Sequence, residues 1–218
     1  MIGVTLNAAG LLIGGIIGLR KNKTISPSDE AFLKLLMGVG TVFAGLYLAW
    51  KSFNGSAGAV FKQFGIVILA MIIGNIAGKL LRLQRMSNAM GQWAGQKLSE
   101  ASAKGTGSFN DGFRVTALLA CISPLAFLAS AQEGLYGFSP AFLVKAAMDG
   151  LAAMSFVTVF GRGVLWAAIP VFAWQGTWVL LASKAAPFLR DHGLLDSVGA
   201  TTGLLILSVS LVILNLKK

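Results

Sequence analysis

Long apolar runs, separated by short basic or glycine-containing segments, make up most of this chain. Seven of the runs are long enough to cross about 30 Å of hydrocarbon, or nearly so, at a helical rise of about 1.5 Å per residue. The pattern predicts an all-α protein, a transmembrane helical bundle of about seven spans in a single membrane domain covering residues 1–218. The expected spans are residues 1–19, 35–50, 63–78, 115–132, 140–160, 163–183 and 197–216.

The pattern changes after the third span. Apolar side chains recur there at three- and four-residue steps, at Leu83, Met86, Met90 and Trp93, with basic and amide side chains between them. This spacing predicts an amphipathic helix lying at the membrane interface. A calmodulin-target or nucleic-acid-binding helix would use the same residue types, but the interfacial helix is the simpler interpretation. Residues 101–112 (ASAKGTGSFNDG) are predicted to be a flexible linker, so that helix and linker together occupy residues 82–112.

Composition supports the membrane class and limits the partners. The chain is 56% hydrophobic and only 12% charged, with a mean hydropathy of +0.76, whereas a soluble domain is about half apolar and a quarter charged. The net charge of +10 could indicate nucleic acid, but the basic residues lie between apolar runs and form no patch. We therefore expect the lipid bilayer to be a partner, and nucleic acid not to be one.

The basic residues also predict the orientation. Thirteen of the eighteen Lys and Arg residues fall on one side of the predicted spans and five on the other. The thirteen are Arg20, Lys21, Lys23, Lys34, Lys79, Arg82, Arg85, Lys97, Lys104, Arg114, Arg162, Lys217 and Lys218; the five are Lys51, Lys62, Lys145, Lys184 and Arg190. Because cytoplasmic loops carry the excess of positive charge, the count predicts an outside N-terminus and a cytoplasmic segment 82–112.

Charged and amide side chains occur inside the later spans. Asp149 should lie roughly 13 Å deep and Gln175 about 12 Å from the same boundary, while Pro124 should lie about 15 Å from the opposite one. These depths place the three residues at one level near the bilayer midplane. An acid at that depth is costly unless paired or hydrated, so Asp149 is a candidate solute- or ion-binding residue, together with Gln132, Glu133, Lys145 and Pro124.

Two prolines interrupt spans at this depth. Pro124 is expected to break the fourth span, and Pro170 the sixth, where it would free the carbonyl of Trp166. Broken helices are tolerated in a membrane where the freed backbone is buried in protein or lines a cavity, and transporters use them to bind solutes and ions. The alternative is a structural Lys145–Asp149 pair, one helical turn apart, that only neutralises itself. Against that alternative, the Lys-before-Asp order is the weaker orientation for such a pair, and Lys145 can extend outward toward Glu133 instead.

Glycines spaced four apart predict close helix packing. Gly10, Gly14 and Gly18 form two overlapping GxxxG repeats in the first span, and Gly74 and Gly78 form another at the end of the third. The segments IGGIIGLR (13–20) and IGNIAGKL (73–80) are similar, which leaves an internal duplication open. The contacts could form within one protomer or across a homo-oligomer. Asn7, in the first span, could hydrogen-bond across such a contact or bind an ion or solute.

Other kinds of chemistry find little support in the sequence. The chain has one cysteine and one histidine, Cys121 and His192, which excludes an intrachain disulfide and a cysteine- or histidine-rich metal site. It contains no nucleophile–base motif and no phosphate-binding Gly–Lys loop, so we expect no cofactor and no enzyme activity. The favoured function is a transporter or channel for a small polar or charged solute. The alternatives are a lipid-handling protein or enzyme using Asp149 and Glu133 as acid and base, and a membrane scaffold.

Several segments resemble one known family. LNAAGLLIGGIIG (6–18), ACISPLAFLASAQEGL (120–135), LVKAAMDGLAAM (143–154), IPVFAWQGTW (169–178) and VGATTGLLIL (198–207) are similar to blocks of the domain of unknown function 554 family. The resemblance covers nearly the whole chain. It implies a multi-pass protein of the bacterial inner membrane and adds no established activity. Family members usually continue past the equivalent of residue 218 into a further apolar segment, so the number of C-terminal spans is open.

Overall fold

The computed structural model describes residues 1–21, 26–53, 56–104 and 107–214, and all regular structure in these residues is α-helical. The helices are α1 (Ile2–Lys21), α2 (Pro27–Ser52), α3 (Ala57–Leu80), α4 (Leu83–Lys104), α5 (Phe109–Ile122), α6 (Pro124–Tyr136), α7 (Ala141–Phe160), α8 (Gly163–Trp166), α9 (Ala168–Asp191) and α10 (Leu195–Ile213). Six helical segments are long and apolar enough to cross a membrane, or seven if the bent pair α5–α6 forms one span. The predicted all-α bundle of about seven spans is confirmed.

Several spans are longer than the apolar runs predicted. Helix α2 begins eight residues before the expected span, at Pro27, because the Ser26 side chain caps it by accepting a hydrogen bond from the Asp29 N–H at 3.1 Å. Proline at the first helical position is favourable there, since its missing N–H would have no partner in any case. Helix α9 likewise continues past the expected end at residue 183 to Asp191.

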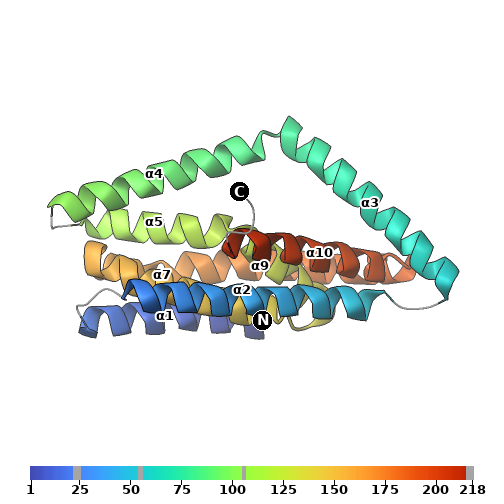
Figure 1. Cartoon of the computed structure of the whole chain (residues 1–218), viewed down its shortest axis with the longest axis horizontal. Coiled ribbons are helices and arrows are strands. Elements are labelled where there is room, and N and C mark those ends of the chain that lie inside the picture. The colour runs from blue at the N-terminus through green and yellow to red at the C-terminus, as the bar shows by residue number, and fades with distance from the viewer. Residues whose placement is uncertain (22–25, 54–55, 105–106, 215–218) are drawn as a thin grey trace.

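Most helices run side by side, while α3 and α4 leave the bundle (Figure 1). Helix α3 slants away from the end of α2, and α4 returns to the start of α5, so that the two form an arch over the bundle (Figure 1). In α3 only Val67 is buried. Helix α4 slants along the bundle and buries Ala94 and Ala101. A helix lying flat on the membrane surface would cross the end of the bundle, whereas α4 runs along its side (Figure 1). The interfacial position of α4 therefore remains a prediction.

The expected linker at residues 101–112 is wrong over most of its length. Helix α4 continues to Lys104 and α5 begins at Phe109, which leaves only a short connection, whose residues 105–106 lie outside the described part. The small residues of this segment serve close packing. Ala101 is buried, and a Cβ added to Gly112 would lie 2.6 Å from the Cβ of Phe160. Sequence composition alone does not distinguish small residues that pack from small residues that flex.

The glycine repeat of α1 lies against α7. A Cβ added to Gly14 would lie 1.9 Å from the carbonyl oxygen of Gly150, and Cβ atoms added to Gly10 and Gly18 would approach α7 carbonyl oxygens to 2.7 and 2.4 Å. The backbones of the two helices therefore touch along three turns. Around Gly74 and Gly78 of α3, an added Cβ would meet nothing within 4 Å. A contact of these two glycines across a homo-oligomer stays a prediction.

The break at Pro124 is confirmed, and the break expected at Pro170 lies slightly earlier. Helix α5 ends at Ile122 and α6 begins at Pro124, with a bend of 57° between them. The second interruption falls at Ala167, where the N–H bonds to the carbonyl of Val164 in a tighter turn. Pro170 lies in the first turn of α9, where no intrahelical partner for its missing N–H is needed. The helix therefore breaks before the proline.

Two apolar clusters form the core, one toward each end of the bundle. We call the end that carries Arg20, Arg114 and Arg162 the basic end. The basic-end cluster comprises Leu11, Ala94, Ala101, Val115, Ala120, Ala153, Val157, Phe160, Val164, Ala168 and Val171. The opposite-end cluster comprises Val4, Ala44, Leu48, Leu125, Ala129, Ala141, Phe142, Val179 and Ile206. The division of the core into two clusters leaves a layer between them.

Candidate functional site

A polar layer lies between the two apolar clusters. On each of three helices a polar residue lies about one turn from a member of each cluster. These are Asn7 between Val4 and Leu11 on α1, the pair Lys145 and Asp149 between Phe142 and Ala153 on α7, and Gln175 between Val171 and Val179 on α9. The α5–α6 break falls at the same place, between Ala120 and Leu125. The layer therefore gathers side chains far apart in the sequence.

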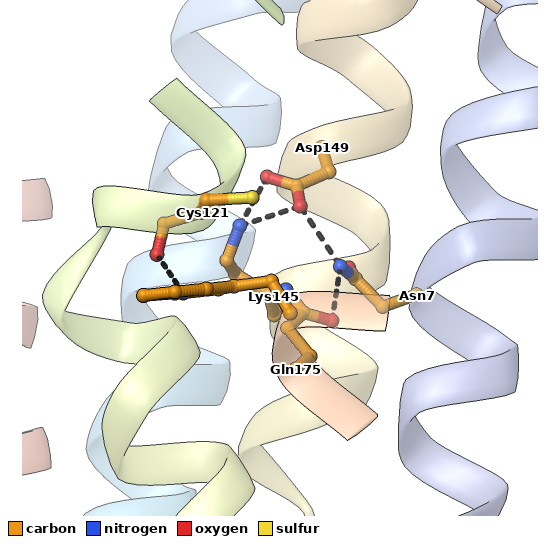
Figure 2. A network of polar contacts seen from close by, with 6 residues as sticks. Asn7, Cys121, Lys145, Asp149 and Gln175 are labelled. Atoms are coloured by element: carbon orange, nitrogen blue, oxygen red, sulfur yellow. Dashed lines mark hydrogen bonds and ion pairs between the residues drawn. The ribbon is translucent and has the colours of Figure 1, made fainter. Parts of the chain in front are cut away.

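Asn7 connects the polar residues of the layer. Its Nδ2 amide donates to Oδ2 of Asp149 and to Oε1 of Gln175, each at 3.0 Å. The Lys145 ammonium donates to both carboxylate oxygens of Asp149 at 2.5 Å. Figure 2 shows the four side chains converging from α1, α7 and α9. Asn7 is thus the central residue of the network.

The network leaves some hydrogen-bonding capacity unused. A carboxylate offers about four acceptor positions, and Lys145 and Asn7 occupy three of those of Asp149. Oδ1 of Asn7 and Nε2 of Gln175 are buried and have no hydrogen-bond partner among the described residues. Buried polar atoms are nearly always paired with protein or with water. These atoms can therefore serve a water or a polar solute, the first as acceptor and the second as donor.

The helix break contributes a backbone group to the same region. The carbonyl of Cys121, near the end of α5, accepts a hydrogen bond from the indole Nε1 of Trp174 at 3.2 Å. Cys121 itself lies beside the Lys145–Asp149 pair (Figure 2). The indole bond satisfies one of the carbonyls that the end of α5 leaves without an intrahelical partner.

A small cavity adjoins the ion pair. Its volume is about 190 Å³, and its walls come from α1, α5, α7 and the break at Ser123. The lining residues are Leu11, Thr116, Leu119, Ala120, Ser123, Lys145, Met148, Asp149, Ala152 and Phe156. Thr116 and Ser123 were not identified from the sequence, because single hydroxyl groups in an apolar span are common and carry no distinctive spacing.

Glu133 binds the start of α1. Its carboxylate accepts hydrogen bonds from the N–H groups of Gly3 at 2.9 Å and Val4 at 3.2 Å, and it lies 2.8 Å from the amine of Met1. The alternative in which Lys145 extends toward Glu133 does not occur, since Lys145 bonds to Asp149. The first N–H groups of a helix have no intrahelical partner and attract negative charge, which explains why a carboxylate from α6 binds the start of α1.

Gln132 and Pro170 lie outside the network. Gln132 is fully buried, and neither atom of its amide has a hydrogen-bond partner among the described residues. Pro170 lies between Ala168 and Val171, two members of the basic-end cluster. It is therefore about one helical turn from the polar layer, on the basic-end side. No group of three or more His, Cys, Asp or Glu side chains gathers in the part of the chain that the structure describes.

The number and length of the spans define a multi-pass membrane protein. The family described as "Protein of unknown function (DUF554)" matches residues 2–218, and the chain belongs to this family. It is 26% identical to the "Uncharacterized membrane protein YdfK" of Bacillus subtilis (strain 168) and 25% identical to the "Uncharacterized protein YqgA" of Escherichia coli (strain K12). Each similarity covers 100% of this chain and 88% of the relative. No solved structure matches it. It is a multi-pass bacterial membrane protein.

Proposed function

We propose that this protein is a transporter or channel for a small polar or charged solute and that Asp149 binds the solute, a cation or a proton. The observation that carries the proposal is the contact of the Asp149 carboxylate with both a polar network and a cavity inside the bundle. Asn7 and Gln175 supply amide groups with spare hydrogen-bonding capacity. The break at Pro124 lets hydroxyl and backbone groups reach the same layer.

The exposure of the two charged residues supports a binding role for Asp149. The side chain of Lys145 is 1% exposed and that of Asp149 is 12% exposed, so the carboxylate is the part of the pair that a solute can reach. Removing an ion pair from water costs several kcal/mol per ion before the charges attract. The adjoining cavity leaves room for water or a solute at the carboxylate, which reduces this cost.

The arrangement favours transport over the acid–base enzyme. An acid–base mechanism with Asp149 and Glu133 requires both carboxyl groups to reach one substrate. Glu133 is instead occupied by the first turn of α1, and Asp149 by Lys145 and Asn7. The two acids therefore serve different contacts.

Proteoliposomes test the proposal. Wild-type protein and Asp149→Asn would each be reconstituted into liposomes that enclose a pH-sensitive dye, which reports the entry of protons. Light scattering would follow the entry of sodium, ammonium, glycerol and glycine. We expect wild-type protein to move at least one of these probes faster than protein-free liposomes do, and Asp149→Asn to lose that movement while remaining folded. The substitution keeps the shape of the side chain and removes its charge.

The control is Asp191→Asn, which removes an exposed carboxylate at the end of α9. It should transport like wild type. Wild-type proteoliposomes that move none of the probes would contradict the proposal. So would an Asp149→Asn protein that unfolds more easily but transports normally, because that result assigns the pair a structural role with Lys145 left unpaired.

A further inference from the structure

Most of the cavity beside Asp149 lies on one side of the polar layer. Relative to the polar layer, its lining residues Leu11, Thr116 and Phe156 all lie on the side of the basic end. They come from three different helices, α1, α5 and α7. Lys145, Met148 and Asp149 line its inner part at the level of the polar layer, so the carboxylate faces a space that lies mainly on the basic-end side.

Side chains and a helix cap close the opposite side of the layer. Val4, Leu125 and Phe142 are at most 1% exposed and belong to one apolar cluster. Glu133 holds the start of α1 against α6 through the N–H groups of Gly3 and Val4. At these three positions, close-packed apolar side chains separate the polar layer from the opposite end.

Thr116 indicates that the cavity is polar enough to be hydrated. The residue is 3% exposed, lines the cavity, and its hydroxyl has no hydrogen-bond partner among the described residues. Because Thr116 borders an open volume, its hydroxyl has room to be satisfied there by water or ligand. The cavity volume of about 190 Å³ corresponds to about six water molecules at about 30 Å³ each.

We propose that Asp149 exchanges its ligand with the basic end alone, through this hydrated cavity, and that the ligand is a small cation or hydrogen-bond donor. The proposal rests on the proposed function, and it adds the side of access and the charge of the solute. Because Asp149 is the more exposed member of the ion pair, the field in the cavity favours positive charge.

Thiol labelling tests the side of access. Thr116→Cys in a Cys121→Ala background would be treated with impermeant methanethiosulfonate reagents in right-side-out and inside-out vesicles. A second variant, Ser102→Cys, shows which membrane face carries the basic end. Ser102 is exposed on α4 and follows Ala101, a buried member of the basic-end cluster. We expect the Thr116→Cys thiol to react from that face and not from the other.

Ser130→Cys is the matched control. Ser130 is also a fully buried hydroxyl without a described hydrogen-bond partner, but it lies on α6 beside Ala129 of the opposite-end cluster. It should react at least about tenfold more slowly from either face, since a closed site reacts only through transient local opening. Reaction of Thr116→Cys from neither face, or from the face opposite Ser102→Cys, would overturn the proposal.

The charge preference of the cavity is tested with a cationic and an anionic methanethiosulfonate reagent of similar size. The rate at which each reagent labels Thr116→Cys is divided by its rate of reaction with a free thiol in solution. We expect Thr116→Cys to favour the trimethylammonium-ethyl compound over the sulfonato-ethyl compound. Adding Asp149→Asn should reverse this preference, because the charge of Lys145 is then unopposed. An unchanged preference would show that Asp149 does not set the field of the cavity.

Labelling and transport can fail separately. One-sided labelling without any flux in proteoliposomes would leave the cavity intact and remove the transport function. Flux that depends on Asp149, with labelling from the wrong face, would keep the function and remove the side of access proposed here.

Discussion

Glu133 shows how a single buried carboxylate can organise a membrane helix. It lies on α6, is 2% exposed, and accepts the N–H groups of Gly3 and Val4 in the first turn of α1. These groups are buried in the protein, and each would remain unsatisfied without the carboxylate. Asn7 follows one turn later on the same helix. Glu133 therefore holds the helix that supplies the central amide of the network.

Replacing Glu133 by leucine should destabilise the protein. Glu133→Leu keeps the approximate volume but leaves two buried N–H groups unpaired, which costs about 1–3 kcal/mol for each group. The measurement is thermal unfolding in detergent, and we expect a clear fall in the midpoint temperature.

The neighbouring Gln132→Leu is the matched control. Gln132 is buried, and its amide has no hydrogen-bond partner among the described residues, so its removal should change stability by less than about 1 kcal/mol. Equal losses for the two variants would show that the cap contributes nothing specific to α1.

At the scale of elements, the contact between α1 and α7 depends on the absence of side-chain atoms. Gly14→Ala would add a methyl group 1.9 Å from the Gly150 carbonyl oxygen, where only a shift of one backbone relieves the overlap. We expect a loss of about 2 kcal/mol or more, as for other overpacked contacts. Thermal unfolding in detergent measures the change, and displacement of α1 should also reduce any flux that depends on Asn7.

Gly65→Ala on α3 is the control for this prediction. An added Cβ at Gly65 meets nothing within 4 Å, and alanine is better than glycine in a helix by about 0.5–1 kcal/mol. The variant should be as stable as wild type or slightly more stable. A Gly14→Ala protein that matches it would mean that the two backbones do not touch in the membrane.

For the whole molecule, the basic residues predict the orientation. With thirteen of eighteen Lys and Arg residues on one side, that side should be cytoplasmic. In intact cells, and in a Cys121→Ala background, an impermeant thiol reagent should label His192→Cys, in the exposed turn after α9, and should not reach Ser102→Cys on α4. Labelling of Ser102→Cys with protection of His192→Cys would reverse the topology. It would also assign the cavity beside Asp149 to the outer face.

The sequence by itself determined the class of protein, a bundle of about seven spans and the break at Pro124. These features depend on local properties: an apolar run long enough for a bilayer forms a helix there, and proline interrupts it. It also identified Asp149, Lys145 and Gln175 as residues that need a polar environment, because burial of charge and amide groups is costly in any membrane fold.

Only the tertiary structure decided which of these residues meet. Asn7 could have served helix packing alone, and Glu133 could have faced Lys145; both outcomes depend on which helices are neighbours. The packing of α1 on α7 brings Asn7 to Asp149, and the packing of α6 beside the start of α1 brings Glu133 to Gly3 and Val4. Such contacts join residues more than a hundred positions apart. No local periodicity encodes them, because they follow from the shapes of whole helix faces.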